Sequence, residues 1–150
     1  MITGYTFHVG DLFHIGHLSQ VLECKEHCDY LIVGVLTDQA AAHYKRLPVI
    51  PYVWRAAIFE ALKAVDKVVP QNSRDPTGNL KDLQPDILFH GEDWGEIPGT
   101  EWMKANGKKV IKTTYYHGLM STSMSLEDIV ARFHDDRDLS SGRVSAERPT

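Results

Sequence analysis

The seven-residue stretch Tyr30–Leu36 constrains the fold of this chain more than any other feature. Its sequence, Tyr-Leu-Ile-Val-Gly-Val-Leu, is apolar at nearly every position, whereas a strand that faces water on one side alternates apolar and polar residues. A run of this kind is typical of a strand whose two faces are both covered by helices, as in a parallel sheet. Because parallel strands need helical crossovers, the rest of the chain should alternate strands with helices.

The pattern along the chain meets this requirement. Further strands are predicted at about Ile2–Val9, Lys67–Val69, Ile87–His90 and Lys109–Thr113. Helices are predicted at about His17–Cys28, Ala40–Tyr44, Tyr52–Ala64, Gly99–Asn106 and Ser123–His134, with a helical turn at Leu80–Leu83. The prediction is an α/β fold with a Rossmann-like, doubly wound, parallel five-stranded sheet, in which ligands bind at the carboxyl ends of the strands.

Length and charge narrow the class of protein. A chain of 150 residues is expected to form a single domain, which we place at 1–135. Residues 136–150 are polar and lack periodicity, which predicts a disordered tail or a linker. The formal net charge of −4 gives no basic footprint for nucleic acid or a membrane surface. With no apolar run of about 20 residues and no basic-then-apolar N-terminus, we expect a cytoplasmic protein.

The two cysteines, Cys24 and Cys28, are four residues apart in a predicted helix. That spacing puts both thiols on one helix face, where a disulfide is geometrically poor. His27 lies between them, but the sequence offers no second cluster of zinc ligands at suitable spacing. We therefore expect buried, reduced thiols.

The segment Gly10–His17, Gly-Asp-Leu-Phe-His-Ile-Gly-His, joins the first predicted strand to the first helix. A helix N-terminus presents unpaired N–H groups and the positive end of the helix dipole, and phosphate binds there readily. Gly16 allows a ligand to approach the backbone closely. His14 and His17 can donate hydrogen bonds to phosphoryl oxygens that gain charge in a transition state. The plainer alternative is that one histidine caps the helix and the other packs against it.

Polar and basic residues follow the next strand. Thr37 and Asp38 come after Tyr30–Leu36 and are either site residues or simply a helix cap. The loop that follows carries Lys45-Arg46, and Arg55 lies on the next helix. Lysine and arginine suit a triphosphate, as a mobile charge and a bidentate fork. We select Lys45 and Arg55, although exposed basic residues are more often plain surface than ligands.

Two later segments complete the candidate site. The first is Gly91-Glu92-Asp93-Trp94, which follows a strand. Its backbone groups could recognise a base, and its acids could bind a sugar hydroxyl or Mg²⁺. Alternatively, the segment is a turn with a packed indole. Met120-Ser121-Thr122-Ser123 precedes the last helix, where hydroxyl and N–H groups either bind phosphate or merely cap the helix. Because each segment follows a predicted strand, we expect them all to meet at one edge of the sheet.

Together these segments resemble the cytidylyltransferases of the glycerol-3-phosphate cytidylyltransferase type, within the HxGH nucleotidyltransferase superfamily. The family's GTFDxxHxGH pattern is matched at Asp11, His14, Gly16 and His17. Its Thr-Asp, basic-loop lysine, helix arginine, GDDW and ISTT elements are similar, in order, to Thr37-Asp38, Lys45, Arg55, Gly91-Glu92-Asp93-Trp94 and Met120-Ser121-Thr122-Ser123. The last two favour the cytidylyl branch over the heptose adenylyl branch. The resemblance covers about residues 2–133.

The resemblance implies transfer of CMP from CTP to a small phosphorylated or phosphonate acceptor, with release of pyrophosphate, by a homodimer that uses Mg²⁺. For catalysis it implies His14, His17, Lys45 and Arg55, with Asp11 as a metal ligand. For nucleotide binding it implies Val9, Gly10, Asp11, Gly16, Gly91, Glu92, Asp93, Trp94, Met120, Ser121, Thr122 and Ser123. For the acceptor it implies Asp38, and we expect Tyr115, Tyr116 and His117 to line the acceptor pocket.

The chain differs from the family pattern in two segments that bear on which substrate is bound. His8-Val9-Gly10 replaces the Gly-Thr-Phe of the first pattern. Tyr116-His117-Gly118-Leu119 replaces Arg-Thr-x-Gly, so an arginine that contacts the triphosphate in the family is absent. We therefore expect a small phosphonate acceptor, such as 2-hydroxyethylphosphonate, or a phosphorylated alcohol such as glycerol 3-phosphate. Two alternatives stay open: an adenylyltransferase of the same superfamily, and a nucleotide-binding sensor or scaffold domain without turnover.

Overall fold

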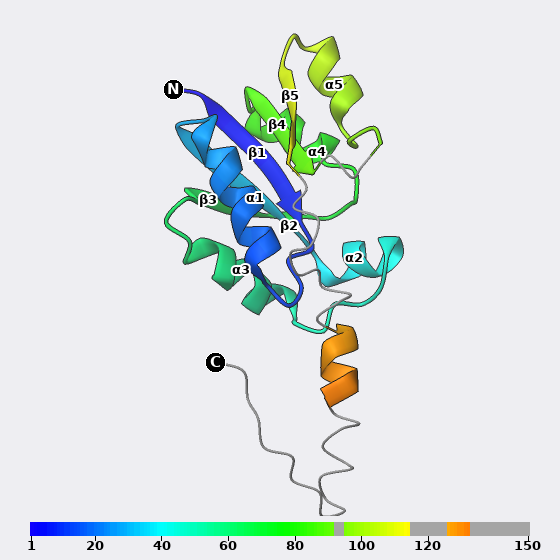
Figure 1. Cartoon of the computed structure of the whole chain (residues 1–150). Helices are drawn as coiled ribbons and strands as arrows, with labels where there is room; N and C mark the ends of the chain where they lie inside the picture. The colour runs from blue at the N-terminus through cyan, green and yellow to red at the C-terminus, as the bar shows by residue number, and fades with distance from the viewer. Residues whose placement is uncertain (92–94, 115–125, 133–150) are drawn as a thin grey trace, which may run out of the picture.

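The computed structural model describes residues 1–91, 95–114 and 126–132. Its sheet consists of five parallel strands in the order β3-β2-β1-β4-β5 (Figure 1). The strands are β1 (Thr3–His8), β2 (Tyr30–Leu36), β3 (Lys67–Gln71), β4 (Ile87–Gly91) and β5 (Lys109–Thr113). The chain builds outward from β1 to β3 and then returns to the other side of β1, so the strand order reverses between β1 and β4. In sheets of this kind the ligand crevice lies at that switch point.

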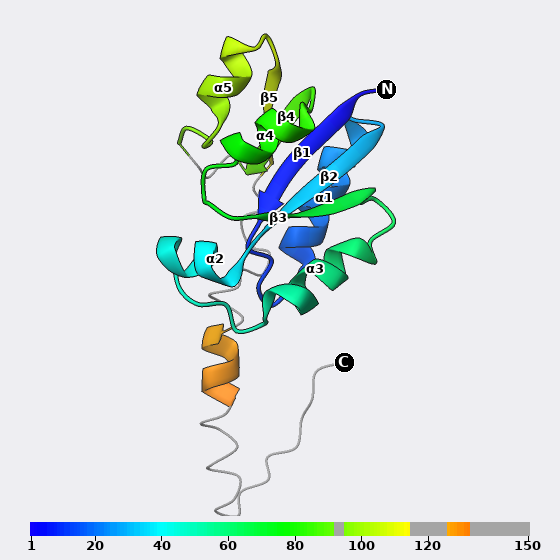
Figure 2. The ribbon, with the colours of Figure 1, turned by 180° about the vertical axis from the view of Figure 1, so that it is seen from behind.

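Helices cover both faces of the sheet, which confirms the doubly wound prediction (Figures 1 and 2). One face carries α1 (Ile15–Glu26) and α3 (Tyr52–Glu60), and the other carries α2 (Asp38–Tyr44), α4 (Thr77–Leu83) and α5 (Thr100–Ala105). A further helical stretch covers 126–132. In the part of the chain that the structure describes, no helix has the length and apolar character to cross a membrane.

The core explains why β2 is apolar throughout. Leu31, Val33 and Val35 pack into one buried cluster, together with side chains of α1 and α3. The intervening Ile32 and Leu36 belong to a second cluster on the opposite face, which includes residues of α2, α4 and α5. Successive side chains of a strand point to opposite faces, so a strand between two helical layers must be apolar at both sets of positions.

Several element boundaries differ from the predicted ones, each for a local reason. β3 runs to Gln71, through Pro70, where the prediction ended at Val69. Proline is tolerated there because β3 is an edge strand, so its missing N–H breaks no central ladder. α4 is a full helix from Thr77, not a single turn, and Pro76 precedes its first residue as a start signal.

The bounds of α1 and α3, the two helices beside the site, also differ from the predicted ones. α1 begins at Ile15 and ends at Glu26, two residues before the predicted His17–Cys28 at each end, because His14 caps its start and the His27 N–H closes its end. α3 ends at Glu60, where the prediction continued to Ala64, and single turns then lead the chain to β3. The predicted helix Ser123–His134 is described only at 126–132, and the predicted tail 136–150 lies outside the described residues.

The cysteine prediction is confirmed. Cys24 and Cys28 are both free thiols and both buried, and the Cys28 thiol donates a hydrogen bond to the Cys24 carbonyl. Burial raises the pKa of both thiols above its usual value. Among the described residues, no group of three metal-binding side chains is placed to hold an ion.

Candidate active site

A sharp turn carries the chain from the end of β1 into α1. Gly10 adopts a positive φ of 68°, which side chains disfavour, and a Cβ at this position would collide with the Phe59 ring. Glycine is therefore required at a position where the family pattern has a bulky residue. Leu12 also has a positive φ, of 46°. This compact turn brings the N-terminus of α1 close to the carboxyl edge of β1.

His14 and His17 form a reciprocal cap at the start of α1. The Gly16 N–H donates to His14 Nδ1 at 3.1 Å, and the His14 N–H donates to His17 Nδ1 at 3.2 Å. Since both Nδ1 atoms accept a hydrogen bond, we assign the proton of each neutral ring to Nε2. The capping interpretation is thus confirmed, and the same bonds turn each Nε2–H away from the backbone as a donor.

Burial keeps both rings uncharged at neutral pH. Burial, with the nearby His14 and Lys45, lowers the pKa of His17 to about 3, although Asp11 acts to raise it. Burial also lowers the pKa of His14. The two ring centroids are 4.0 Å apart, a separation at which two imidazolium ions would repel each other strongly. The pair therefore offers two neutral, oriented N–H donors.

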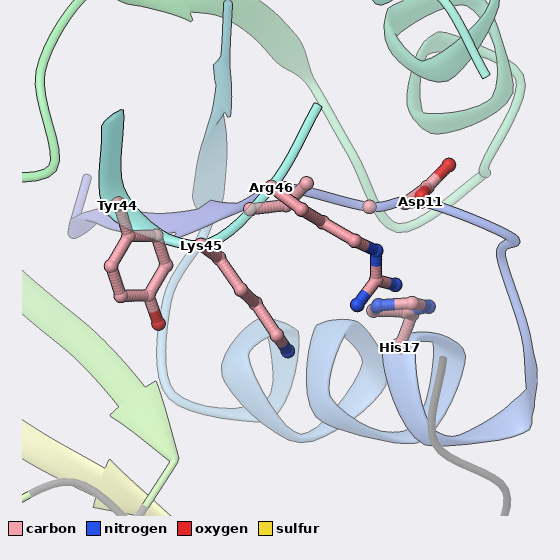
Figure 3. Close-up of a pocket in the computed structure, with 7 residues that line it drawn as sticks. Asp11, His17, Tyr44, Lys45 and Arg46 are labelled. Atoms are coloured by element: carbon pink, nitrogen blue, oxygen red, sulfur yellow. The ribbon is translucent and has the colours of Figure 1, made fainter. Parts of the chain in front are cut away.

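A pocket of about 120 Å³ lies beside this cap, between the turn after β1 and the loop after α2 (Figure 3). Its lining residues are Val9, Gly10, Asp11, His17, Tyr44, Lys45 and Arg46. The Lys45 and Arg46 side chains extend toward α1, the helix that carries His17 (Figure 3). The structure thus brings together the predicted residues His17 and Lys45, with Val9 and Gly10 as backbone walls.

Arg46 is a site residue that the sequence analysis did not select. Its Nε atom is buried and has no hydrogen-bond partner within the part of the chain that the structure describes. A buried donor without a partner is costly in a folded protein, which indicates a place for an anionic ligand. The sequence contains one indication of this role, because Arg46 follows Lys45 directly. Adjacency alone does not show that both side chains reach the same pocket.

Arg55 lies in the interior of the protein. Its side chain is fully buried, and Nε donates to the Ile50 carbonyl at 2.8 Å while Nη2 donates to Asp38 Oδ1 at 2.7 Å. A third bond joins Nη1 to the Val9 carbonyl. The guanidinium therefore lies inside the protein, where it holds the turn after β1 and the loop before α3, and a substrate contact of Arg55 stays a prediction. Asp38, predicted to bind the acceptor, is the ion-pair partner of Arg55, and its contact with an acceptor stays a prediction.

Asp11 likewise has a structural partner on the loop after α2. Its carboxylate is buried and accepts the N–H groups of Val49 and Ile50, both at 2.9 Å. In Figure 3 the carboxylate points away from Lys45. Asp11 and Arg55 together fix the segment that presents Lys45 and Arg46. They are positioning residues, and the described side chains form no magnesium cage around Asp11.

The end of β1 adds a second missed residue, His8. It is buried, its ring stacks on Phe59 at 5.4 Å, and it lies 6.0 Å from the His17 ring and 6.4 Å from the His90 ring. Burial, followed by His17 and His90, lowers the pKa of His8 well below its usual value. The signal was present in the sequence, because His8 stands where the family has glycine.

The other half of the predicted site is only partly described. Gly91 ends β4, next to His90, at the same sheet edge as His8. The predicted nucleotide residues Glu92, Asp93, Trp94, Met120, Ser121, Thr122 and Ser123, and the predicted acceptor residues Tyr115, Tyr116 and His117, lie outside the described residues.

Comparison with known proteins agrees with this geometry. The family model described as cytidylyltransferase-like matches residues 9–143. The bifunctional protein HldE of Caulobacter sp. (strain K31) is 33% identical over 125 residues, which cover 81% of this chain and 26% of that protein. HldE of Yersinia pestis (strain Pestoides F) is 34% identical over 118 residues, 76% of this chain and 25% of that protein. The chain thus spans about a quarter of the length of these curated relatives.

Solved structures show the same fold. A lipopolysaccharide core biosynthesis protein from Thermoplasma volcanium superposes with a TM-score of 0.70 at 27% identity, covering 77% of this chain and 98% of that chain. A pantoate-β-alanine ligase from Francisella tularensis superposes with a TM-score of 0.57 at 16% identity, covering 80% of this chain and 63% of that chain, which shows a shared fold alone. The HxGH turn, the switch-point pocket and the family match lead to one conclusion: this chain is a member of the cytidylyltransferase-like family.

Proposed function

We propose that the chain is a cytidylyltransferase, which transfers CMP from CTP to a small phosphonate or phosphorylated alcohol and releases pyrophosphate. One observation carries the proposal: a neutral Nε2–H donor of His17 and the cations Lys45 and Arg46 line a single pocket at the switch point of the sheet. Hydrogen-bond donors and fixed positive charge are the groups that stabilise the charge of a reacting triphosphate.

The reaction needs no covalent enzyme intermediate. An oxygen of the acceptor's phosphonate or phosphate attacks the α-phosphorus and forms a new P–O bond. The bond between the α-phosphorus and the α,β-bridging oxygen breaks, and its electron pair leaves with pyrophosphate. No proton has to be removed from an ionised acceptor, so the protein's contribution is positioning and charge stabilisation.

Each type of side chain contributes differently to the stabilisation of charge. His14 and His17 donate Nε2–H hydrogen bonds to oxygens of the α- and β-phosphates, where negative charge grows as the bridging bond breaks. Lys45 supplies a mobile charge and Arg46 a two-pronged donor for the β- and γ-phosphates. Arg46 thereby compensates for the arginine that the chain lacks after β5. Mg²⁺ would enter with the nucleotide, bound through its phosphates.

The choice of CTP rests on the resemblance in Gly91-Glu92-Asp93-Trp94 and Met120-Ser121-Thr122-Ser123. The test is pyrophosphate release with Mg²⁺ and either CTP or ATP, against a panel that includes 2-hydroxyethylphosphonate and glycerol 3-phosphate. We expect release with CTP and a compact acceptor. Release with ATP alone would assign the chain to adenylyl transfer. Nucleotide binding without release from any pair would instead support a sensor or scaffold.

The resemblance also leads us to propose a homodimer in the cytoplasm. Sedimentation velocity over a range of protein concentrations measures the assembly state directly, and a monomer at every concentration would reject the homodimer.

A further inference from the structure

A backbone hydrogen bond fixes one nitrogen of the His17 ring but does not define the plane of the ring. The His14 N–H donates to His17 Nδ1 at 3.2 Å, which is at the long end of the usual range. A bond to one ring atom decides which nitrogen faces the backbone, whereas the ring can still tilt about that contact. The direction of Nε2–H into the pocket therefore also depends on the groups that lie against the ring.

The His17 ring belongs to a closed cluster of four aromatic rings. Phe13 stacks on His17, with the centroids 5.4 Å apart and the planes 25° apart, and His8 meets His17 edge-on at 6.0 Å. Phe59 contacts both of these neighbours, Phe13 edge-on at 5.3 Å and His8 in a stack at 5.4 Å. Stacked and edge-to-face pairs at these separations are the arrangements that aromatic rings prefer. Because the contacts form a closed loop, tilting one ring disturbs its neighbours.

Phe59 connects this ring cluster to the core of the protein. It lies on α3, has no exposed surface, and packs in the same buried cluster as Val33 and Val35 of β2. Phe13 lies on the turn before α1 and is only partly buried against that cluster. The rings therefore link a rigid helix in the core to a side chain in the wall of the pocket.

The position of Phe59 also gives a common reason for two differences from the family pattern. Its ring stacks on His8, where the family has glycine. A Cβ at Gly10, where the family has a bulky residue, would collide with the same ring. The ring gained at position 8 and the side chain lost at position 10 both fit around Phe59, so this turn is built to pack against α3.

We propose that Phe13 and Phe59 are positioning residues that fix the plane of the His17 ring. Phe13 covers that ring directly, and Phe59 acts through Phe13 and His8. The consequence for catalysis rests on the proposed function, in which His17 donates Nε2–H to a phosphate oxygen. A misplacement of about 1 Å can lower a rate about 10²-fold, so the direction of this donor matters. The same rings keep water from His17, in agreement with the burial that lowers its pKa.

The experiment observes the His17 ring directly, without nucleotide. Two-bond ¹H–¹⁵N correlation spectra of the imidazole groups report the tautomer and the pKa of each ring, and the spectrum of His17→Asn identifies the His17 signals. Phe13→Leu removes the stacked ring, and Phe13→Tyr keeps it at a residue that is only partly buried. Phe59→Leu removes the ring that holds both neighbours. Phe89→Leu is the matched control, because Phe89 is equally buried in the same core cluster but contacts His27. Thermal melts confirm that each variant is folded.

In the wild type we expect a single neutral tautomer of His17 with its proton on Nε2. In Phe13→Leu the ¹⁵N shifts should move toward the average of the two neutral tautomers, because the ring turns more freely. The pKa of His17 should rise from about 3 toward the usual value of about 6.5, because water reaches the ring. Phe59→Leu should move the same signals in the same direction, whereas Phe13→Tyr and Phe89→Leu should keep the wild-type spectrum. Wild-type His17 signals in both Phe13→Leu and Phe59→Leu would overturn the proposal.

Pyrophosphate release then measures the consequence for turnover. We expect Phe13→Leu to lower kcat by about 10- to 100-fold while KM for the nucleotide stays within about twofold, because the oriented donor matters most in the transition state. Phe13→Tyr and Phe89→Leu should keep kcat close to the wild-type value. Altered His17 signals with an unchanged kcat would overturn the role of these two residues in the reaction. A wild type that releases no pyrophosphate from any pair of substrates would reject the proposed function, whereas the spectra still decide whether Phe13 and Phe59 fix the ring.

Discussion

At the residue scale, His14 and His17 show how one side chain can serve structure and chemistry at once. Each ring uses Nδ1 to accept a backbone N–H of the first turn of α1. Each therefore presents Nε2–H to the space beyond the helix. The sequence analysis treated helix capping and phosphate binding as competing interpretations, but the two nitrogen atoms of an imidazole allow both. Only the coordinates could show this, because the spacing of the motif does not define ring orientation.

This division of roles predicts that His17→Asn and His17→Ala behave differently. Asparagine can accept the His14 N–H with its side-chain oxygen but has no group at the Nε2 position. We therefore expect His17→Asn to keep a near-normal Tm and to lose about 10²–10³-fold in kcat, the effect of removing one preorganised donor. Alanine should lose both turnover and the cap, at about 0.5–2 kcal/mol of stability. Steady-state pyrophosphate release and thermal melts measure the two effects, and near-normal turnover by either variant would reject the role of His17.

At the element scale, the segment between α2 and α3 is positioned by partners that are distant in sequence. Asp11, after β1, accepts the N–H groups of Val49 and Ile50, and Arg55, on α3, donates to the carbonyls of Val9 and Ile50. The sequence predicted the strands and helices well because their apolar patterns are local. It did not reveal that Asp11 and Arg55 hold this loop, since a charged residue in a motif looks the same whether it touches substrate or holds a loop.

The variant Arg55→Leu distinguishes a role of Arg55 in holding the loop from a role in binding substrate. Removing the guanidinium leaves two buried carbonyl acceptors unpaired, at an expected cost of about 1–3 kcal/mol, while Asp38 is partly exposed and can be hydrated. Urea denaturation should show this loss of stability, with reduced turnover that follows from the displaced Lys45 and Arg46. A variant that keeps wild-type stability and loses only nucleotide affinity would mean that Arg55 contacts substrate after all.

Gly34 of β2 ties the sheet to the loop after β3. A Cβ at this position would collide with the Tyr5 hydroxyl and reach Gln71 Oε1, and the Gln71 side chain holds that loop through the carbonyls of Ser73 and Arg74. Gly34→Ala should cost about 1–3 kcal/mol of stability by overpacking. Gly78→Ala in α4 is the matched control, because a Cβ there meets open space and alanine favours helix. Urea denaturation of both variants provides the comparison.

At the scale of the whole molecule, the strand order decides what the motifs can build. The order β3-β2-β1-β4-β5 places β1 and β4 side by side, so His8 and His90 meet across the switch point. The local patterns predicted strands and their carboxyl-edge site, but strand order depends on long-range packing that no short pattern contains. This is why Lys45 could be selected from the sequence, whereas the contact between His8 and His90 could not be predicted.

The gathering of histidines at this edge makes stability depend on pH. Burial lowers the pKa of His8, His14, His17 and His90 in the folded state, to about 3 for His17 and about 4 for His90. Below the usual value of about 6.5 the unfolded chain takes up protons that the folded chain does not. Stability should therefore fall as the pH drops from 6.5 toward 4, by up to about 1.4 kcal/mol per pH unit for each buried ring of His8, His17 and His90. The more exposed His14 should contribute less, because solvent screens its charge.

Urea denaturation between pH 5 and 6.5 tests this slope. His90→Asn keeps an acceptor near the Gly91 N–H, which bonds His90 Nδ1 at 2.9 Å, but removes the titrating ring. The free energy of unfolding of this variant should depend less steeply on pH than that of the wild type, and the difference should correspond to the uptake of close to one proton on unfolding. Identical slopes for the two proteins would show that His90 does not remain neutral in the fold.

Tyr44 lines both the pocket beside His17 and a second pocket at the carboxyl ends of β1, β2 and β4, so its side chain forms part of a wall between them. A smaller residue here would merge two cavities into one larger chamber, while His17 and Lys45 would keep their places. The size of the space at this edge of the sheet therefore depends in part on one side chain. A substitution at position 44 would change which molecules fit there and would leave the proposed triphosphate-binding groups in place.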